Sequence, residues 1–315
     1  MNALNTVGLR IGHATDEAYH TGCSVFLCPP GTVVSADVRG PAPGSRESAL
    51  LQPDKPTSDI NAVLMTGGSA FGLSAADGVM RYLAERGIGH TTPIKPIPLV
   101  AAAVVYDLFF SLGQRYPTPE LGYAACLAAD AENVAQGNVG AGAGVTVGKW
   151  NGFPGPMKGG FGLASAREGE IVVFAATVVN AIGDVLAADG TPLAGAQTPD
   201  GGWAVRDNPY RLYRGRRPEN LALENTTLVL VATNVALTKV EAYRLAQRAH
   251  DGMAQAIRPI HTTHDGDTAF GLSTGAVQGN FDWVANIAAE VVAEAIRNGV
   301  RQARSVGQVR GLAGD

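Results

Sequence analysis

The dipeptide Asn225-Thr226 stands where a polar segment gives way to an apolar run. Residues 189–224 are rich in Gly, Pro, Asn and Arg, and residues 226–232 are two threonines followed only by apolar residues. A hydroxyl at such a boundary can attack the preceding carbonyl, and cleavage would give Thr226 an α-amine with a reference pKa of about 7.7–8.0. An N-terminal threonine holds nucleophile and general base in one residue. The alternative is an ordinary junction between a turn and a strand, where threonine is common.

The segment HTTHDGDT, residues 261–268, is the second place where side chains could do chemistry. Asp265 and Asp267 are two apart, so in an extended segment both carboxylates face the same way and could orient a nucleophile. His261 and His264, together with the two aspartates, could instead ligate a metal and serve a metal-assisted hydrolase. Asp-Gly-Asp is also a common turn sequence. The residues leave all three interpretations open, and a binding protein without catalysis remains a further alternative.

Two lysines follow glycine-rich sequence. Lys149 ends GNVGAGAGVTVGK, residues 137–149, and Lys158 lies in MKGG. The first segment fits neither a phosphate-binding loop nor a dinucleotide fingerprint, because the required glycines and the Ser or Thr after the lysine are missing. A lysine near the nucleophile could lower a pKa or hold a developing oxyanion. A solvated surface lysine is the alternative for both.

Two further side chains could contact an oxyanion or a substrate. Asn180 ends the uncharged run 171–179, where its amide could donate to an oxyanion or satisfy the end of a strand. Tyr106 lies in the apolar run 99–110, next to Asp107. Its hydroxyl could donate to substrate, or the ring could simply pack with its hydroxyl at the rim.

The hydrophobic pattern predicts an α/β layered sandwich in which these residues would be positioned. The predicted strands are Val33–Asp37, Ala62–Met65, Ile171–Val179 and Thr226–Ala232. The predicted helices are one of about 17 residues that Ser69 caps and Gly87 ends, and Glu120–Asn133, Lys239–Ile257 and Asn286–Asn298. We expect residues 189–224 to form a long surface linker.

Composition excludes several classes of protein. The chain has 315 residues, 46% hydrophobic and 17% charged, with a net charge of −4. It contains no Lys/Arg block typical of nucleic-acid binding, no signal peptide and no run of about 18 apolar residues. Its three cysteines lack metal-ligand spacing and are expected to be small buried thiols. We therefore expect a cytoplasmic protein with no nucleic-acid or membrane partner.

Five segments together resemble one known family. They are MTGGSAFGL (65–73), GNVGAGAGVTVGK (137–149), MKGGFG (157–162), ENTTLVLVATN (224–234) and HTTHDGDTAFGLSTG (261–275). In order and spacing they are similar to the self-processing aminopeptidases of the D-aminopeptidase/esterase and β-peptidyl aminopeptidase type. The 6-aminohexanoate-oligomer (nylon-oligomer) hydrolase belongs to the same group, and the resemblance covers nearly the whole chain.

The resemblance implies a four-layer αββα sandwich, similar to N-terminal-nucleophile hydrolases but with different connectivity. It implies a single domain, 1–315, that cleaves itself into fragments 1–225 and 226–315. No metal or organic cofactor is implied. The substrate would be a peptide or a small linear amide, and the assembly a homo-oligomer, with a tetramer favoured. The residues to which it assigns roles are the nucleophile Thr226, the oxyanion and substrate contacts Asn180 and Tyr106, the acidic pair Asp265 and Asp267, and Lys149.

The chain departs from many aminopeptidases of this group at two places. They have Gly-Ser at the cleavage point, where this chain has Asn225-Thr226, and Ser and Glu at the acidic pair, where it has Asp265 and Asp267. Its pattern is that of the nylon-oligomer hydrolase. Lys158 in the MKGG segment is more similar to the peptidase branch. The sequence therefore predicts the reaction more closely than the substrate.

Overall fold

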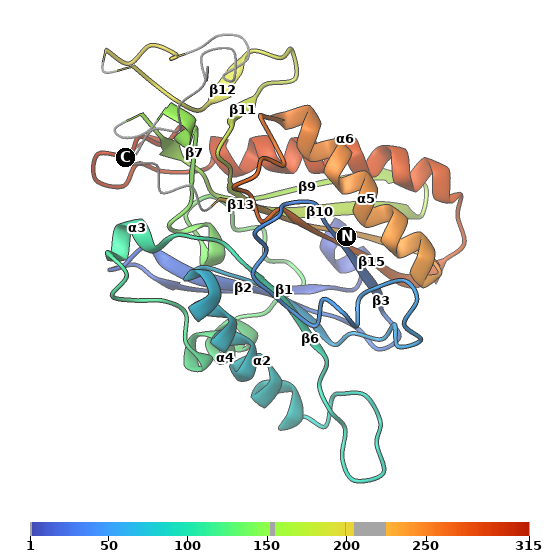
Figure 1. Cartoon of the computed structure of the whole chain (residues 1–315). Coiled ribbons are helices and arrows are strands. Elements are labelled where there is room, and N and C mark those ends of the chain that lie inside the picture. Colours follow the sequence, from blue (N-terminus) through green and yellow to red (C-terminus); the bar gives the residue numbers. More distant parts are fainter. Residues whose placement is uncertain (1, 152–154, 199, 205–224, 315) are drawn as a thin grey trace.

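Two five-stranded sheets stack face to face, and helices cover both outer faces (Figure 1). The computed structural model describes residues 2–151, 155–198, 200–204 and 225–314. One apolar core fills the space between the sheets, and two others lie between each sheet and its helices. The layers are therefore helix, sheet, sheet and helix, which confirms the expected αββα sandwich.

The first sheet has the strand order β1-β2-β5-β6-β4. Its strands are β1 Arg10–Asp16, β2 Thr21–Leu27, β4 Ser45–Arg46, β5 Ala62–Thr66 and β6 Val100–Val104. Helices α2 (Ala75–Ala84) and α4 (Pro119–Leu127) pack on its outer face. Glycines allow the two helices to approach closely, since a Cβ at Gly122 would lie 2.0 Å from the carbonyl oxygen of Ala75.

The second sheet has the order β3-β15-β13-β10-β9. Its strands are β3 Val33–Val38, β9 Phe161–Glu168, β10 Ile171–Asn180, β13 Thr226–Val235 and β15 Thr268–Val277. The long helices α5 (Lys239–Ala256) and α6 (Phe281–Arg301) cover it. The strand β13 is central and buried on both faces, with Leu228 and Leu230 toward the other sheet and Val229 toward the helices. Double burial explains why its sequence is a continuous apolar run.

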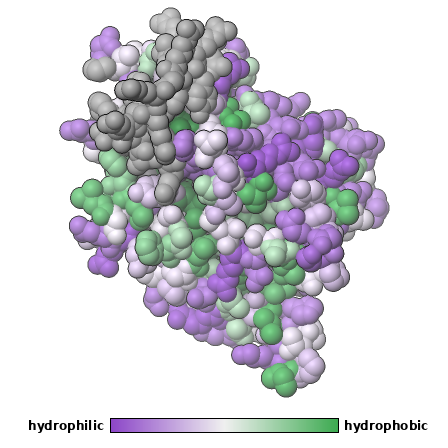
Figure 2. Space-filling view, viewed as in Figure 1, coloured by the Kyte–Doolittle hydropathy of each residue, from purple (hydrophilic) through white to green (hydrophobic). Residues whose placement is uncertain are grey.

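Short elements connect these layers. They are α1 Ala3–Thr6, η1 Ser69–Ser74, α3 Leu108–Ser111, η2 Gly140–Gly142, β7 Thr146–Val147, η3 Lys149–Asn151, β8 Met157–Lys158, β11 Asp184–Leu186, β12 Pro192–Ala194 and β14 Ile257–Arg258. Figure 2 shows a mixed surface, in which hydrophilic side chains prevail on the right and apolar side chains lie mainly on the left, below the grey part. None of the described helices is long and apolar enough to cross a membrane.

The four predicted strands are confirmed, each ending within three residues of its expected bounds. The predicted N-cap at Ser69 is wrong. Ser69 has a φ of 52° and starts the 3-10 helix η1, whose cap is Gly68, and α2 begins only at Ala75. Gly87 does stop this helix, with a φ of 66°. That left-handed conformation is the one glycine adopts without strain.

The other helices differ from their predicted bounds for local reasons. The helix expected over 120–133 ends at Leu127, because Asp130 pairs with Ile11 on the edge of the first sheet. The last helix begins at Phe281 and not Asn286, because the Asn280 side chain accepts from the backbone N–H of Asp282 at 2.8 Å. The predicted linker is partly wrong, since 192–194 form the strand β12; residues 205–224 lie outside the described residues.

Candidate active site

The strand register brings Thr226 and Asn180 together. Thr226 is the first residue of β13 and Asn180 the last of β10, and the antiparallel pairing sets their Cα atoms directly opposite each other. By strand alternation Thr226 lies on the same face as Leu228, which packs between the sheets. Two residues from separate segments of the sequence thus meet where the inner strands β10 and β13 end and begin.

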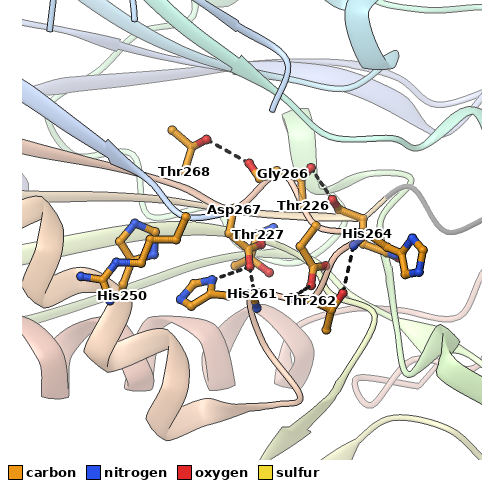
Figure 3. A network of polar contacts seen from close by, with 12 residues as sticks. Thr226, Thr227, His250, His261, Thr262, His264, Gly266, Asp267 and Thr268 are labelled. Atoms are coloured by element: carbon orange, nitrogen blue, oxygen red, sulfur yellow. Dashed lines mark hydrogen bonds and ion pairs between the residues drawn. The ribbon is translucent and has the colours of Figure 1, made fainter. Parts of the chain in front are cut away.

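The carbonyl oxygen of Asn225 accepts two hydrogen bonds. Thr226 Oγ1 donates to it at 2.5 Å, and the backbone N–H of Gly266 donates at 2.8 Å (Figure 3). Both residues of the Asn225-Thr226 bond are nearly buried, 2% and 6% exposed. A Cβ on Gly266 would lie 2.7 Å from Thr226 Oγ1 and 2.5 Å from the carbonyl oxygen of Ala42. Only glycine therefore fits at this position without a shift of the backbone.

A pocket of about 340 Å³ opens onto this peptide bond. It is lined by Ala42, Pro43, Gly44, Ser69, Ala70, Val104, Tyr106, Asn225, Thr226 and His264. Most of this lining is small or apolar, and Tyr106 and His264 are its aromatic members. Larger hollows of about 560 Å³ lie between α5 and α6 and beside Arg10, away from Thr226, so size does not identify the site.

Asp267 is fully buried and accepts three hydrogen bonds. Its Oδ1 accepts from the backbone N–H of Thr227 at 2.7 Å. Its Oδ2 accepts from Nδ1 of His261 at 2.8 Å and from the backbone N–H of the same histidine at 3.2 Å. The Thr227 bond ties this carboxylate to the start of β13, one residue after Thr226.

Asp265 is also buried but has fewer hydrogen bonds. Its Oδ2 accepts from the backbone N–H of Thr262 at 2.7 Å, and its Oδ1 has no partner among the described residues. Burial, helped by the neighbouring charge of Asp267, raises the pKa of Asp265 to about 6 against the opposing effects of Thr262 and Lys149. Its backbone pairs with Asn225 in a parallel bridge. The two aspartates thus have different environments at the same site.

Lys149 lies against Asn180. Its Nζ donates to the side-chain oxygen of Asn180 at 2.8 Å and to the backbone oxygen at 3.1 Å. The amide of Asn180 in turn donates to the carbonyl of Tyr106 at 3.1 Å. Burial lowers the pKa of Lys149 to about 7, although the charge of Asp265 opposes this. These contacts connect Tyr106, Asn180 and Lys149 behind Thr226.

Lys158 has a different environment. Its Nζ donates to the carbonyls of Ala143 at 2.8 Å and Val145 at 2.9 Å, and it lies 5.1 Å from the centre of the Phe110 ring. Burial lowers the pKa of Lys158 to about 7. The interpretation as a solvated surface lysine is wrong for Lys158, which is 0% exposed, and for Lys149, which is 7% exposed. Of the two, Lys149 is the one bonded to Asn180.

The sequence alone assigns no role to Asp107. Its carboxylate holds in place the backbone just before Ser69, which lines the pocket. Its carboxylate accepts from the backbone N–H of Gly68 at 2.6 Å and from the hydroxyl of Thr21 at 2.7 Å. Burial raises the pKa of Asp107 to about 6. These bonds fix the turn that leads Ser69 into the pocket. A carboxylate inside the apolar run 99–110 was the available signal, because a buried charge requires partners.

The metal interpretation of segment 261–268 finds no cluster to support it. Within the described ranges, no group of three or more His, Cys, Asp and Glu side chains is arranged to hold a metal ion. His261 bonds Asp267, and the ring of His264 points away from that pair (Figure 3). The turn predicted at Asp265-Gly266-Asp267 lies earlier in the chain, at Thr262–Asp265, where the N–H of Asp265 donates to the carbonyl of Thr262. Asp265 itself pairs with Asn225, and Asp267 lies beyond the turn.

The chain matches a family model and named relatives over most of its length. The model of peptidase family S58 matches residues 2–313. An uncharacterised aminopeptidase of Mycobacterium tuberculosis is 40% identical over 294 residues, covering 88% of this chain and 83% of its own. A 6-aminohexanoate-oligomer endohydrolase of Paenarthrobacter ureafaciens is 32% identical over 275 residues, covering 86% of this chain and 74% of its own.

Two solved structures have the same fold. A β-aminopeptidase of Burkholderia sp. superposes with a TM-score of 0.74 at 20% identity, covering 98% of this chain and 90% of its own. The L-aminopeptidase D-Ala-esterase/amidase of Ochrobactrum anthropi, described as a variant of the Ntn-hydrolase fold, gives 0.73 at 17%, with 98% and 89% covered. The fold and the family match define a hydrolase of amide bonds with an N-terminal-nucleophile-hydrolase fold. The chain belongs to peptidase family S58.

Proposed function

We propose that this amide hydrolase cuts its own chain between Asn225 and Thr226 and then uses Thr226 as its catalytic nucleophile. The observation that carries the proposal is the Asn225 carbonyl, which accepts from the Thr226 hydroxyl at 2.5 Å and from the Gly266 amide at 2.8 Å. A polarised carbonyl beside a hydroxyl is the arrangement that acyl transfer requires.

Maturation begins when Thr226 Oγ attacks the carbonyl carbon of Asn225. The C–O bond forms, the C–N bond breaks, and the hydroxyl proton passes to the nitrogen of Thr226, which gives an ester. Water then cleaves the ester, leaving a carboxylate on Asn225 and a threonine with an α-amine. The products are fragments 1–225 and 226–315 of a single domain.

In turnover, the α-amine of Thr226 takes the proton from its own hydroxyl as the oxygen attacks a substrate amide. The amide of Asn180, with the hydroxyl of Tyr106 or the ammonium of Lys149, stabilises the oxyanion. Asp265 and Asp267 orient the nucleophile. Water resolves the acyl-enzyme, and this scheme uses no metal or organic cofactor.

We propose a linear amide as substrate, either a peptide with an accessible N-terminus or an oligomer of an ω-amino acid. The named relatives support both, since one is an aminopeptidase and another a 6-aminohexanoate-oligomer endohydrolase. The pair Asn225-Thr226 with Asp265 and Asp267 favours the oligomer. A cytoplasmic location and a homo-oligomer, with a tetramer favoured, stay predictions.

The test compares Thr226→Ala with a matched change at the next residue. Thr226→Ala should give one uncut chain of 315 residues that hydrolyses neither an aminoacyl anilide nor a 6-aminohexanoate oligomer. Thr227→Val is the control, because the hydroxyl of Thr227 has no partner in the described part of the chain, and it should cleave as the wild type does. Intact mass under denaturing conditions and amine release are the measurements. A cut or active Thr226→Ala protein would overturn the proposal.

A further inference from the structure

Asp267 is held by a histidine to which the proposed chemistry gives no role. His261 directs two donors at one oxygen of Asp267, Nδ1 at 2.8 Å and its backbone N–H at 3.2 Å. Its φ of 55° is uncommon for a residue with a side chain. The backbone of His261 is strained, and both of its donors point at one carboxylate oxygen. Strain of this kind is typical of functional sites, where the surrounding structure maintains it.

The surroundings of His261 are buried. The ring of His250 packs edge-on against it, with centroids 4.8 Å apart, and burial lowers the pKa of His250 to about 4. His250 is therefore neutral near pH 7. Behind it lies Asp37, whose backbone oxygen is 3.1 Å from Nε2 of His250. Asp37 in turn accepts from Arg39 and Tyr243, each at 3.0 Å.

The hydrogen bonds divide the acidic pair into two unlike groups. Asp267 receives three donors, two from His261 and one from Thr227, so both of its oxygens are held in place. Asp265 receives one backbone donor and keeps a buried Oδ1 without a partner among the described residues. Two neighbouring buried carboxylates bind a proton more readily than one. The donors of His261 thus act against protonation of the pair.

We propose that His261 is a positioning residue for the nucleophile. It holds Asp267 as the fixed carboxylate that anchors the start of β13 through the Thr227 N–H, and it leaves Asp265 as the member of the pair that exchanges a proton. The inference rests on the proposed function, because it assigns the pair to Thr226. Among the described residues, Lys149 also acts on the pair, because its charge favours the deprotonated form of Asp265.

The consequence is a defined pH dependence. Removing the Nδ1 donor takes one hydrogen bond from the deprotonated acidic pair, so the pair holds its proton to higher pH. Self-cleavage precedes the release of the Thr226 α-amine and needs the pair deprotonated, so the acid side of its pH profile should move upward. The rate of self-cleavage at higher pH, where the pair is deprotonated in both proteins, should change little.

The experiment uses two nearly isosteric substitutions in the full chain. His261→Leu removes the donor, and His261→Asn restores an N–H close to the position of Nδ1. We expect the acid midpoint of His261→Leu to rise by about one pH unit, a tenfold loss of rate below the midpoint, while His261→Asn keeps the wild-type midpoint. The rate of self-cleavage of freshly synthesised chain is followed by denaturing mass spectrometry from pH 5 to 8.

The outcomes separate this inference from the function on which it rests. A wild-type midpoint in His261→Leu, or the same upward shift in both variants, would overturn the role of His261. A purely structural role would lower the yield or melting temperature of the variants without moving the midpoint. Cleavage in Thr226→Ala would instead overturn the proposed function, because the acidic pair would then have no nucleophile to serve.

Discussion

Burial shifts the pKa values of the titratable groups at the site. Burial raises the pKa of Asp265 and Asp107 to about 6 and lowers the pKa of Lys149 and Lys158 to about 7. Acids and bases that differ by many pH units in water thus change charge within a narrow range near neutrality. Groups with such shifts cluster at catalytic sites, where a proton must move at physiological pH.

Lys149 should make the activity of the enzyme decline at alkaline pH. If its ammonium supports Asn180 and the oxyanion, activity requires its charged form and should decline as the pH rises through about 7, the pKa to which burial lowers it. Lys149→Met should abolish that alkaline decline and reduce kcat by about 10²- to 10³-fold, the usual loss for one oxyanion donor. The measurement is kcat for amine release from pH 6 to 10.

Lys158→Met is the matched control, because it removes an equally buried lysine whose bonds go to the carbonyls of Ala143 and Val145. This variant should lose stability, since two buried acceptors lose their donor. It should keep the alkaline decline in its folded fraction. The reverse pattern, with the decline lost only in Lys158→Met, would exchange the roles of the two lysines.

Among the elements, the central strands are predictable from sequence and their pairing is not. The strands β10 and β13 are uncharged apolar runs, so Ile171–Val179 and Thr226–Ala232 could be recognised directly. The register that sets Asn180 opposite Thr226 depends on the whole sheet. No local pattern indicates it, and the two residues were joined only through the family resemblance.

Tertiary contacts likewise determine what surrounds these strands. Lys149 lies in η3, where the next residue, Trp150, donates its ring N–H to the buried Asp184 at 2.9 Å. This contact joins residues 34 positions apart and could not be predicted from the glycine-rich segment. The predicted cap at Ser69 failed for a similar reason. The backbone there turns to bring Gly68 to Asp107, and this tertiary hydrogen bond replaces the local capping pattern.

The loop before β15 supplies the backbone donor to the Asn225 carbonyl, the N–H of Gly266. Gly266→Ala would place a Cβ 2.5 Å from the backbone oxygen of Ala42 and 2.7 Å from Thr226 Oγ1. The loop must shift, and the Asn225 carbonyl would lose its backbone donor. Self-cleavage should slow by about 10²-fold or more, because a preorganised donor to the reacting carbonyl is removed. The cleaved fraction over time, measured by denaturing mass spectrometry, tests this.

Gly202→Ala is the control for the loss of a glycine. Among the described residues, its Cβ would meet the ends of the Thr198 and Asp200 side chains, at 3.1 and 3.9 Å, and both residues are exposed or half-buried in a surface turn. This variant should cleave at the wild-type rate. If Gly266→Ala also cleaved at that rate, the Gly266 amide would have no part in the reaction.

The two proposed fragments contribute interleaved strands to the second sheet of the molecule. Strands β3, β10 and β9 belong to residues 1–225, and strands β13 and β15 belong to residues 226–315. In the sheet order β3-β15-β13-β10-β9, the second fragment therefore lies between strands of the first. Helices α5 and α6, which also come from the second fragment, cover the outer face of this sheet.

Cleavage at Thr226 should therefore leave the molecule in one piece. The cut falls just before the first residue of β13 and breaks none of the pairings of that strand with β10 and β15. Separating the fragments would expose both faces of the sheet, whose apolar residues are almost fully buried. Native mass spectrometry should give 32.5 kDa per chain plus one water, or a multiple of it for an oligomer, fourfold for the favoured tetramer. Denaturing conditions should give two fragments. If residues 226–315 eluted separately from a gel-filtration column, the cut would lie elsewhere or the sheet would not hold the pieces together.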